Sequence, residues 1–370
     1  MKSFSRFMKM SALSVLAVCG LVSCSEDGKE TVSADLRLVP DKTVIEPNGF
    51  DAVTFTVEYD GIDVTDESSV YMEDGTPAGF TFTTDAEGSY GFYAEYKGER
   101  SETVTIVATS TMPEIPEDPE PENTAFSRKV LLLQFTGTGC SFCPYVLSAL
   151  KELEASPVRT QFVKVACHSY NPDDKAYYSG PLADVLNEEK QYPYVTYDLD
   201  KDLYTENNLS SQYLFSQFRS NIISETTNRP ALAGIAASSA LIGGNVVVSM
   251  SVKVSETGEY KVAAWLVEDG IYDEQANPNQ VPGDFDTHND CLRYAQYTGS
   301  GKSADYTGVS LGTVSAGEEA GYTFSIPVEE GWNAENCHLV LLVTAEDGNA
   351  FYVNNVAACE IGGTVEYEYE

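Results

Sequence analysis

The stretch VLLLQFTGTGCSFCP occupies residues 130–144 and indicates how its region folds. Its first half is typical of a buried strand, its glycines of a turn, and its end of a helix start. Behind it, apolar residues recur at helical spacing: Val146, Leu147, Leu150 and Leu153. Two cysteines at C-x-x-C spacing on a strand-to-helix turn predict a thioredoxin-like α/β domain.

Two kinds of chemistry fit Cys140 and Cys143. At a helix N-terminus, unpaired N–H groups and the helix dipole favour a thiolate. Cys140 would then be the attacking thiol of a redox pair, and Cys143 the resolving thiol. Alternatively, the two residues form a structural disulfide or half of a metal site. A zinc site usually needs a second pair, and the sequence has no further C-x-x-C and no H-x-x-x-H.

The first residues predict an exported lipoprotein. The chain has 370 residues, enough for about two or three domains. Residues 1–23 combine a basic start with a short apolar run, which is typical of a signal peptide. Residues 21–24, Leu-Val-Ser-Cys, resemble a bacterial lipobox, so Cys24 is the expected acylation site and the contact with outer-membrane lipid. Acidic residues directly after Cys24 resemble a surface-export signal, and residues 24–33 form a polar tether.

The charge limits the range of partners. Lys and Arg number 22 and Asp and Glu 57, which gives a formal net charge of −35. Such a surface repels phosphate backbones, so the sequence argues against nucleic-acid binding. It also repels anionic lipid, which leaves the acyl anchor as the membrane contact. The sequence indicates no cofactor.

Flanking segments predict an all-β region on each side of the C-x-x-C domain. Residues 34–110 alternate apolar and polar positions between regular turn signals, which predicts an immunoglobulin-like β-sandwich. Residues 111–125 alternate proline and acid, which predicts a stiff, self-repelling linker. The α/β domain then covers residues 126–228, and residues 229–370 predict a second β-sandwich.

Within the α/β domain, Pro193 opens the strand expected after the middle helix. In a thioredoxin-like fold a proline at this place is usually cis, faces the C-x-x-C and helps to bind an extended peptide. We therefore expect Pro193 to lie beside Cys140 and Cys143. His168 ends an expected strand, and the sequence offers it no triad partner; the same holds for His338.

Three further sets of residues have candidate roles. Cys337 and Cys359 flank a probable hairpin at equal distance from Gly348, which favours a disulfide between them; Cys167 and Cys291 would stay buried thiols. Asp286, His288 and Asp290 could chelate a metal, but a solvated loop or a local hydrogen bond of His288 is favoured. Asp198, Asp200 and Asp202 match only the start of a calcium loop, so a solvated acidic turn is favoured.

Taken together, these features resemble the Omp28-related outer-membrane lipoproteins of Bacteroidota. The resemblance rests on the C-x-x-C stretch, on Tyr192-Pro193, and on residues 266–270, 288–293 and 332–337. It covers about residues 126–361 and implies a lipid-anchored protein whose thioredoxin-like domain precedes a β-domain. It implies no particular activity.

Two positions depart from a working thioredoxin. Gln134 stands six residues before the first cysteine, where thioredoxins carry a buried aspartate that moves a proton. Gly139 stands where they carry a tryptophan. Since a general base needs a suitable pKa, Gln134 cannot take that role. The sequence therefore favours a lipoprotein that binds protein or peptide and keeps a structural disulfide. An extracytoplasmic thiol–disulfide oxidoreductase is the alternative, so enzyme activity stays open.

Overall fold

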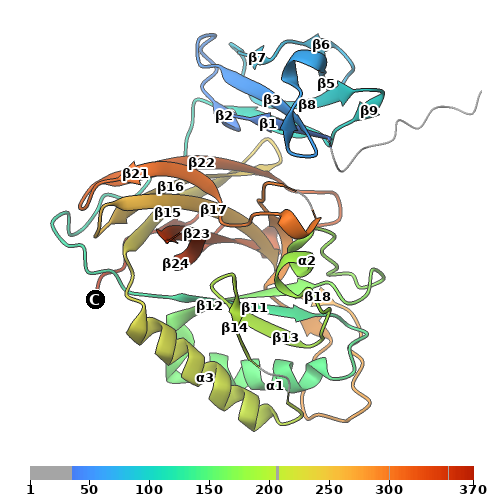
Figure 1. Cartoon of the computed structure of the whole chain (residues 1–370), viewed down its shortest axis with the longest axis vertical. Helices are drawn as coiled ribbons and strands as arrows, with labels where there is room; N and C mark the ends of the chain where they lie inside the picture. The colour runs from blue at the N-terminus through green and yellow to red at the C-terminus, as the bar shows by residue number, and fades with distance from the viewer. Residues whose placement is uncertain (1–35, 206–207, 300, 349) are drawn as a thin grey trace, which may run out of the picture. The chain divides into compact units, whose positions relative to one another are not determined.

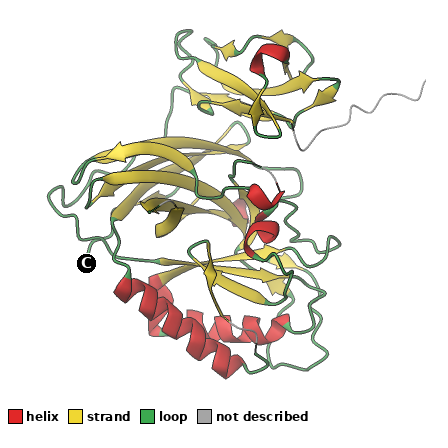
Figure 2. Cartoon of the chain, in the orientation of Figure 1, coloured by secondary structure: helices red, strands yellow, loops and turns green. Residues whose placement is uncertain are grey.

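The computed structural model describes residues 36–205, 208–299, 301–348 and 350–370. The predicted signal segment 1–23, the tether 24–33 and Cys24 lie outside the described residues. The described part is mostly β-strand with few helices (Figure 2), so a β-rich chain, as the sequence predicts, is confirmed. Within this part, no helix is both long enough and apolar enough to cross a membrane.

Residues 36–108 form two small sheets around one core. The first sheet holds β1 (Leu36–Pro40), β3 (Val53–Tyr59), β4 (Ile62–Asp63) and β7 (Thr81–Phe82). The second holds β2 (Val44–Ile45), β5 (Ser69–Met72), β6 (Pro77–Ala78), β8 (Gly88–Tyr96), β9 (Glu99–Arg100) and β10 (Val104–Ala108). Phe55 and Phe92, one from each sheet, pack with ring centroids 4.9 Å apart. The predicted alternation therefore buries one face of each sheet.

A nine-stranded sheet carries the strand of the C-x-x-C stretch (Figure 1). Its order is β14 (Asp200–Thr205), β13 (Tyr194–Tyr197), β11 (Val130–Thr136), β12 (Phe162–His168), β20 (Cys291–Ala295), β17 (Gly258–Glu268), β23 (Cys337–Asp347) and β24 (Ala350–Glu360), with β21 (Val309–Val314) on β17. β11 runs parallel to β12 and antiparallel to β13. Every residue of β11 is buried, as expected for a strand covered on both faces.

The predicted boundary at residues 228/229 does not separate two sheets. Strands β11 to β14 come from the expected α/β domain, and β17, β20, β23 and β24 come from the expected C-terminal sandwich. The two sets join where β12 pairs in parallel with β20, at Ala166 and Cys291. This pairing satisfies backbone groups that a free β12 edge would leave exposed. Trp265 of β17 is fully buried in the resulting core.

Helices cover one face of β11 to β13. α1 (Cys143–Glu154) and α3 (Ser211–Asn228) lie together on this face (Figure 1), where Leu150 and Phe218 pack in the same core as Leu132. α2 (Leu182–Leu186) packs on the opposite face, with Leu133 of β11. Short 3-10 turns occur at Thr65–Glu67, Pro157–Gln161, Gly301–Ser303 and Ala334–Asn336.

A further sheet packs against β17 and β23. It contains β22 (Glu319–Pro327), β16 (Asn245–Val254), β15 (Ala233–Ile242) and β25 (Thr364–Val365) in that order. Buried Val248 and Leu341, from opposite sheets, belong to the same core. β18 (Ile271–Tyr272) and β19 (Thr287–His288) form a separate short ladder.

The acidic, proline-rich segment 111–125 docks on the protein, which differs from the self-repelling spacer that its composition predicts. Asp118 accepts hydrogen bonds from Lys253 Nζ at 2.7 Å and from the Tyr369 hydroxyl at 2.7 Å. Lys253 is 1% exposed, and Ile115 packs on the core that contains Phe126. A buried ammonium needs a counter-charge, and the acidic segment supplies it.

Candidate functional site

Cys140 and Cys143 lie where β11 turns into α1. Their sulfur atoms are 2.10 Å apart, at disulfide distance. Cys143 is the first residue of α1, and Pro144 follows at a position that suits proline, because N–H groups there have no partner within the helix. Cys140 is only 2% exposed and Cys143 is 0% exposed. Both sulfurs are thus shielded, whereas an attacking thiol must be reachable.

Tyr170 covers the glycine turn before Cys140. A Cβ at Gly137 would lie 2.6 Å from the Tyr170 Cβ, and a Cβ at Gly139 would lie 3.2 Å from the Tyr170 Cε1. The glycines therefore allow the ring to approach the backbone closely. An aromatic ring from residue 170 therefore covers the turn.

A distant segment holds the same turn in place. Gln275 Nε2 donates hydrogen bonds to the carbonyl groups of Thr138 at 3.0 Å and of Cys140 at 3.1 Å. The Ala276 N–H also donates to the Thr138 carbonyl, at 2.7 Å. Sequence reasoning missed Gln275, because it lies 135 residues from Cys140 in a polar loop without a motif.

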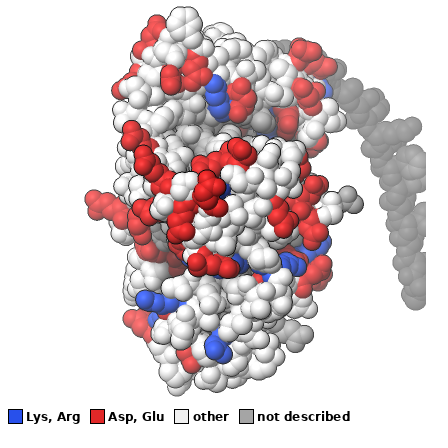
Figure 3. Space-filling model, turned by 90° about the vertical axis from the view of Figure 1, so that its left-hand side faces the viewer, with Lys and Arg blue, Asp and Glu red and all other residues white. Residues whose placement is uncertain are grey.

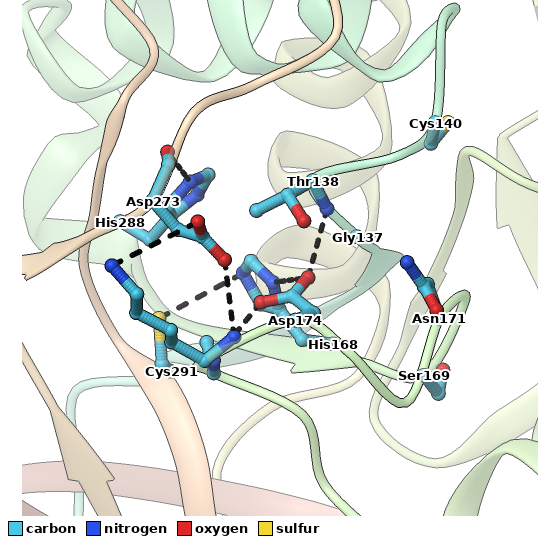
Figure 4. A network of polar contacts seen from close by, with 12 residues as sticks. Gly137, Thr138, Cys140, His168, Ser169, Asn171, Asp174, Asp273, His288 and Cys291 are labelled. Carbon is cyan, nitrogen blue, oxygen red and sulfur yellow. Dashed lines mark hydrogen bonds and ion pairs between the residues drawn. The ribbon is translucent and has the colours of Figure 1, made fainter.

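His168, Asp174 and Cys291 form a buried row beside the turn (Figure 4). His168 Nδ1 lies 2.8 Å from Asp174 Oδ2, and its Nε2 lies 3.7 Å from Cys291 Sγ. The three residues are 1%, 5% and 0% exposed, respectively. The sequence offered His168 no triad partner, whereas the structure places Asp174 and Cys291 at its two ring nitrogens. Asp174 folds back from the following loop, and Cys291 comes from β20, which only the shared sheet brings close.

Asp174 links this row to the turn. Its Oδ2 accepts the Thr138 N–H at 2.8 Å, and its Oδ1 accepts the Ala176 N–H at 2.9 Å. Burial alone would raise the pKa of Asp174, but His168 and these N–H groups outweigh burial and lower the pKa to about 2. Burial raises the pKa of the Cys291 thiol. Near neutral pH the carboxyl group is therefore charged and the thiol is protonated.

His288 lies against His168, with ring centroids 4.9 Å apart and edge-to-face geometry. Its Nε2 lies 3.1 Å from the backbone oxygen of Asp273, a residue 15 positions earlier in the chain. Burial lowers the pKa of His288. Asp290 instead pairs with Lys164 at 2.9 Å. Across the described ranges, no three His, Cys, Asp or Glu side chains are arranged to hold a metal ion.

His338 also has partners that the sequence did not reveal. Its Nε2 lies 3.5 Å from Asp290 and its Nδ1 3.6 Å from Asp269. Burial alone would lower its pKa, but Asp290 outweighs burial, and the pKa of His338 is raised. His338, near the start of β23, therefore lies in a cluster of ionisable side chains with Asp269 and Asp290.

The tyrosines on either side of Pro193 each pack against a further tyrosine ring. The Tyr192–Pro193 bond is cis. Tyr192 packs edge-on against Tyr170, with centroids 5.2 Å apart, and Tyr194 stacks on Tyr204 at 5.8 Å. Tyr170 is 48% exposed and Tyr204 47% exposed. We name Tyr170, Tyr192, Tyr194 and Tyr204 the tyrosine row.

The predicted disulfide between Cys337 and Cys359 is wrong, because both are buried free thiols. The hairpin pairs Asp347 with Ala350, and a bulge shifts the register further along β23. Cys359 consequently lies opposite Leu339 rather than Cys337. Two cysteines at equal spacing from a turn lie opposite each other only when the turn length is known and the strand pairing has no bulge.

Comparisons with known proteins found one matching family model and solved structures that are only distantly similar. Residues 192–365 match the family model "Outer membrane protein Omp28". None of the curated proteins compared with the chain matches it. HBP35 of Porphyromonas gingivalis is 11% identical, covers 65% of this chain and 77% of its own, and has a TM-score of 0.42. A domain of the outer membrane lipoprotein Omp28 from Porphyromonas gingivalis is 20% identical, covers 36% and 89%, and has a TM-score of 0.22. Both TM-scores are below 0.5.

Proposed function

Residues 192–365 match the Omp28 family model of outer membrane proteins, and on this basis we propose that the chain is a lipid-anchored, surface-exposed peptide-binding protein of this family. Cys24 carries the acyl anchor and makes the contact with outer-membrane lipid. The tyrosine row beside Pro193 binds an extended polypeptide. Cys140 and Cys143 form a structural disulfide that fixes the edge of this surface.

The strand arrangement supports a thioredoxin-like domain. β11 and β12 are parallel, β13 and β14 are antiparallel to their neighbours, and α1 directly follows β11. A cis proline opens β13. Residues 36–108 form two sheets around one core, which similarly supports an immunoglobulin-like fold. We assign this domain the role of a spacer from the membrane.

Burial of the disulfide is the observation that favours binding over turnover. Cys140 is 2% exposed, and hydrogen bonds from Gln275 together with the ring of Tyr170 hold and cover its turn. Thiol–disulfide exchange requires in-line attack on a sulfur atom, and this cover slows such an attack. Tyr170, beside the turn, and Tyr204 of the same row are exposed instead. Tyrosine provides a large contact area with little loss of side-chain freedom, and it is enriched in binding surfaces.

The net charge of the chain limits which peptides it would bind. Acidic side chains are spread over the face shown in Figure 3, where basic ones are few. With a net charge of −35, the chain repels acidic peptides at long range and attracts basic ones. We therefore expect neutral or basic extended segments to bind best.

An array of immobilised decapeptides that vary in net charge tests this proposal. The probe is the mature protein in detergent micelles, either unchanged or with Tyr170→Ser, Tyr204→Ser or the control Tyr272→Ser. Tyr272 is 64% exposed and lies outside the tyrosine row. Tyr170→Ser and Tyr204→Ser should each lower the affinity for peptide about fivefold, because an aromatic contact contributes about 1 kcal/mol. The control Tyr272→Ser should leave the affinity unchanged. Equal affinities of all four proteins would refute the proposed surface.

A second candidate function is thiol–disulfide exchange, and the buried His168–Asp174 pair beside the turn favours it. The reduction potential of the Cys140–Cys143 pair distinguishes the two. A value between about −120 and −270 mV is typical of working oxidoreductases, and a value below about −300 mV of structural bridges. Equilibration with dithiothreitol, alkylation and mass analysis of the modified thiols give this value.

A further inference from the structure

Two rings of the tyrosine row stack on β13 and β14, and β14 ends the strand order of the nine-stranded sheet. Tyr194 packs against Phe135 with ring centroids 6.0 Å apart, and Tyr204 stacks on Tyr194 at 5.8 Å. Phe135 is 0% exposed, whereas Tyr204 is 47% exposed. The stack therefore runs from the core to the surface, where the ring of Tyr204 is accessible to a ligand.

A bulge in β14 lies directly before Tyr204. The register between β13 and β14 shifts, so that residues 201–203 have no partner in the ladder. The buried hydroxyl of Thr196 lies 2.6 Å from the Asp200 carbonyl and 2.8 Å from the Leu203 carbonyl, and it ties the two ends of the bulge together. Leu203 packs on the core under α1 and α3. The bulge is therefore held in place from inside the protein.

The bulge places carboxylates beside the stacked rings. The Tyr194 hydroxyl donates to the Lys201 carbonyl at 3.5 Å, and the Asp202 N–H donates to Asp200 Oδ1 at 2.9 Å. Burial raises the pKa of Tyr194, and the charges of Tyr204, Asp202 and Asp200 raise it further. A carboxylate has this effect only when it lies close to the phenol. Neutral phenol rings and negative charge therefore share one surface.

The three aspartates of this segment have different surroundings. Asp198 is 0% exposed and pairs with Arg128, so the solvated acidic turn expected from the sequence does not include it. Arg229 lies 3.7 Å from Asp200 and offsets part of its charge. Among the ion pairs of the described residues, none includes Asp202, which is exposed. Its carboxylate is thus available to a cation from outside.

We propose that Tyr204 and Asp202 form a subsite for an arginine side chain of the bound polypeptide. The inference rests on the proposed function and names the residue of the ligand that is recognised. A guanidinium is planar and weakly hydrated, so it stacks on the Tyr204 ring while its N–H groups donate to the Asp202 carboxylate. The chain itself contains the first kind of contact, because the Arg229 guanidinium lies 5.6 Å from the centroid of the Tyr352 ring.

A local subsite differs from the long-range attraction of the whole chain. The net charge of −35 favours any basic peptide, wherever its charge lies. A stacking contact instead requires a cation at one place, and it depends on one ring and one carboxylate. Citrulline separates the two effects in the ligand, because it has nearly the shape of arginine without the charge. Single substitutions separate them in the protein.

The test uses two labelled decapeptides of alternating serine and valine, with blocked ends and either arginine or citrulline at one central position. Fluorescence anisotropy with the mature protein in detergent micelles gives both dissociation constants. The wild type should bind the arginine peptide about fivefold more tightly. Tyr204→Leu and Asp202→Asn should each bring this ratio toward one, whereas Tyr204→Phe keeps the ring and the ratio. The control Asp74→Asn removes the same charge from an exposed turn between β5 and β6 and should leave the ratio unchanged.

Equal binding of the two peptides by the wild type would overturn the inference. The proposed function would then still stand if Tyr170→Ser weakens the binding of both peptides. A ratio that persists in either Tyr204→Leu or Asp202→Asn would also overturn the inference, because the preference would then come from the net charge. Circular dichroism identifies a variant that fails to fold, and the other variant then decides. If the wild type binds neither peptide, the proposed function and this inference are both refuted.

Discussion

Replacement of Arg128 by methionine should destabilise the nine-stranded sheet strongly. The side chain of Arg128 is 3% exposed and pairs with Asp198, whose side chain is 0% exposed. Arg128 also donates to the Val353 carbonyl at 3.1 Å, and Asp198 accepts the Leu131 N–H at 2.8 Å. The pair therefore connects β11, the turn between β13 and β14, and β24.

The expected loss is about 3–5 kcal/mol, the usual cost of removing one partner from a buried ion pair. It should depend on pH. Burial raises the pKa of Asp198 to about 6, although Arg128 opposes this effect. Without Arg128 the pKa rises further. The folded state binds this proton more tightly than the unfolded state does. The free energy of unfolding therefore decreases as the pH rises from the unfolded pKa of Asp198 through its folded pKa. The destabilisation of Arg128→Met should thus be smaller at pH 5 than at pH 8.

Urea unfolding at pH 5 and pH 8, followed by tryptophan fluorescence, measures both effects. Trp265 lies on β17 in the same sheet and is fully buried, so it reports on this unit. Lys201→Met is the matched control, because Lys201 is 64% exposed and lies 3.8 Å from Glu188. An exposed pair contributes about 0–1 kcal/mol. A loss in Arg128→Met no larger than in the control, or equal losses at both pH values, would refute the reasoning.

Three further predictions use the same unfolding assay. Replacement of both Cys140 and Cys143 by serine should lower stability by about 2 kcal/mol, because the bridge closes only a short loop; unchanged stability would argue against the bridge. Leu150→Ala should cost about 2–5 kcal/mol, because Leu150 is 2% exposed in the core under α1; a loss below about 1 kcal/mol would mean that α1 is not packed there. The raised pKa of His338 gives stability that is complete below its unfolded pKa of 6.5 and is lost as pH rises through the folded pKa. His338→Gln should therefore flatten the decline above pH 6.5, and an unchanged slope would show that Asp290 does not stabilise the imidazolium.

Local patterns predicted the elements of this protein well. The apolar run of β11, the glycine turn and the spacing of α1 all lie within residues 130–154. Helix and strand periodicity depends on neighbours a few residues away, so the sequence contains that information directly. The strand that follows Pro193 was predicted for the same reason.

The site was less predictable, because its parts come from distant segments. His168 is a lone histidine in the sequence, and its contacts with Cys291 and His288 depend on pairing between β12 and β20. Gln275 lies in a polar loop whose composition indicates only exposure to solvent. In the structure it is 5% exposed and holds the turn of the disulfide.

The sequence by itself therefore determined the β-rich class, the strand–turn–helix around Cys140 and Cys143, and the family resemblance. It also determined the acidic character, because charge is a sum over residues. The pairing that joins β17, β20, β21, β23 and β24 to the sheet of β11, while β15, β16, β22 and β25 form the sheet packed on them, became visible only in the tertiary structure. The tertiary structure alone decided the register that keeps Cys337 from Cys359, and the burial of both sulfurs of the C-x-x-C pair. These features depend on which edges pair and on where bulges fall, and those choices minimise unpaired backbone groups and exposed apolar surface over the whole chain.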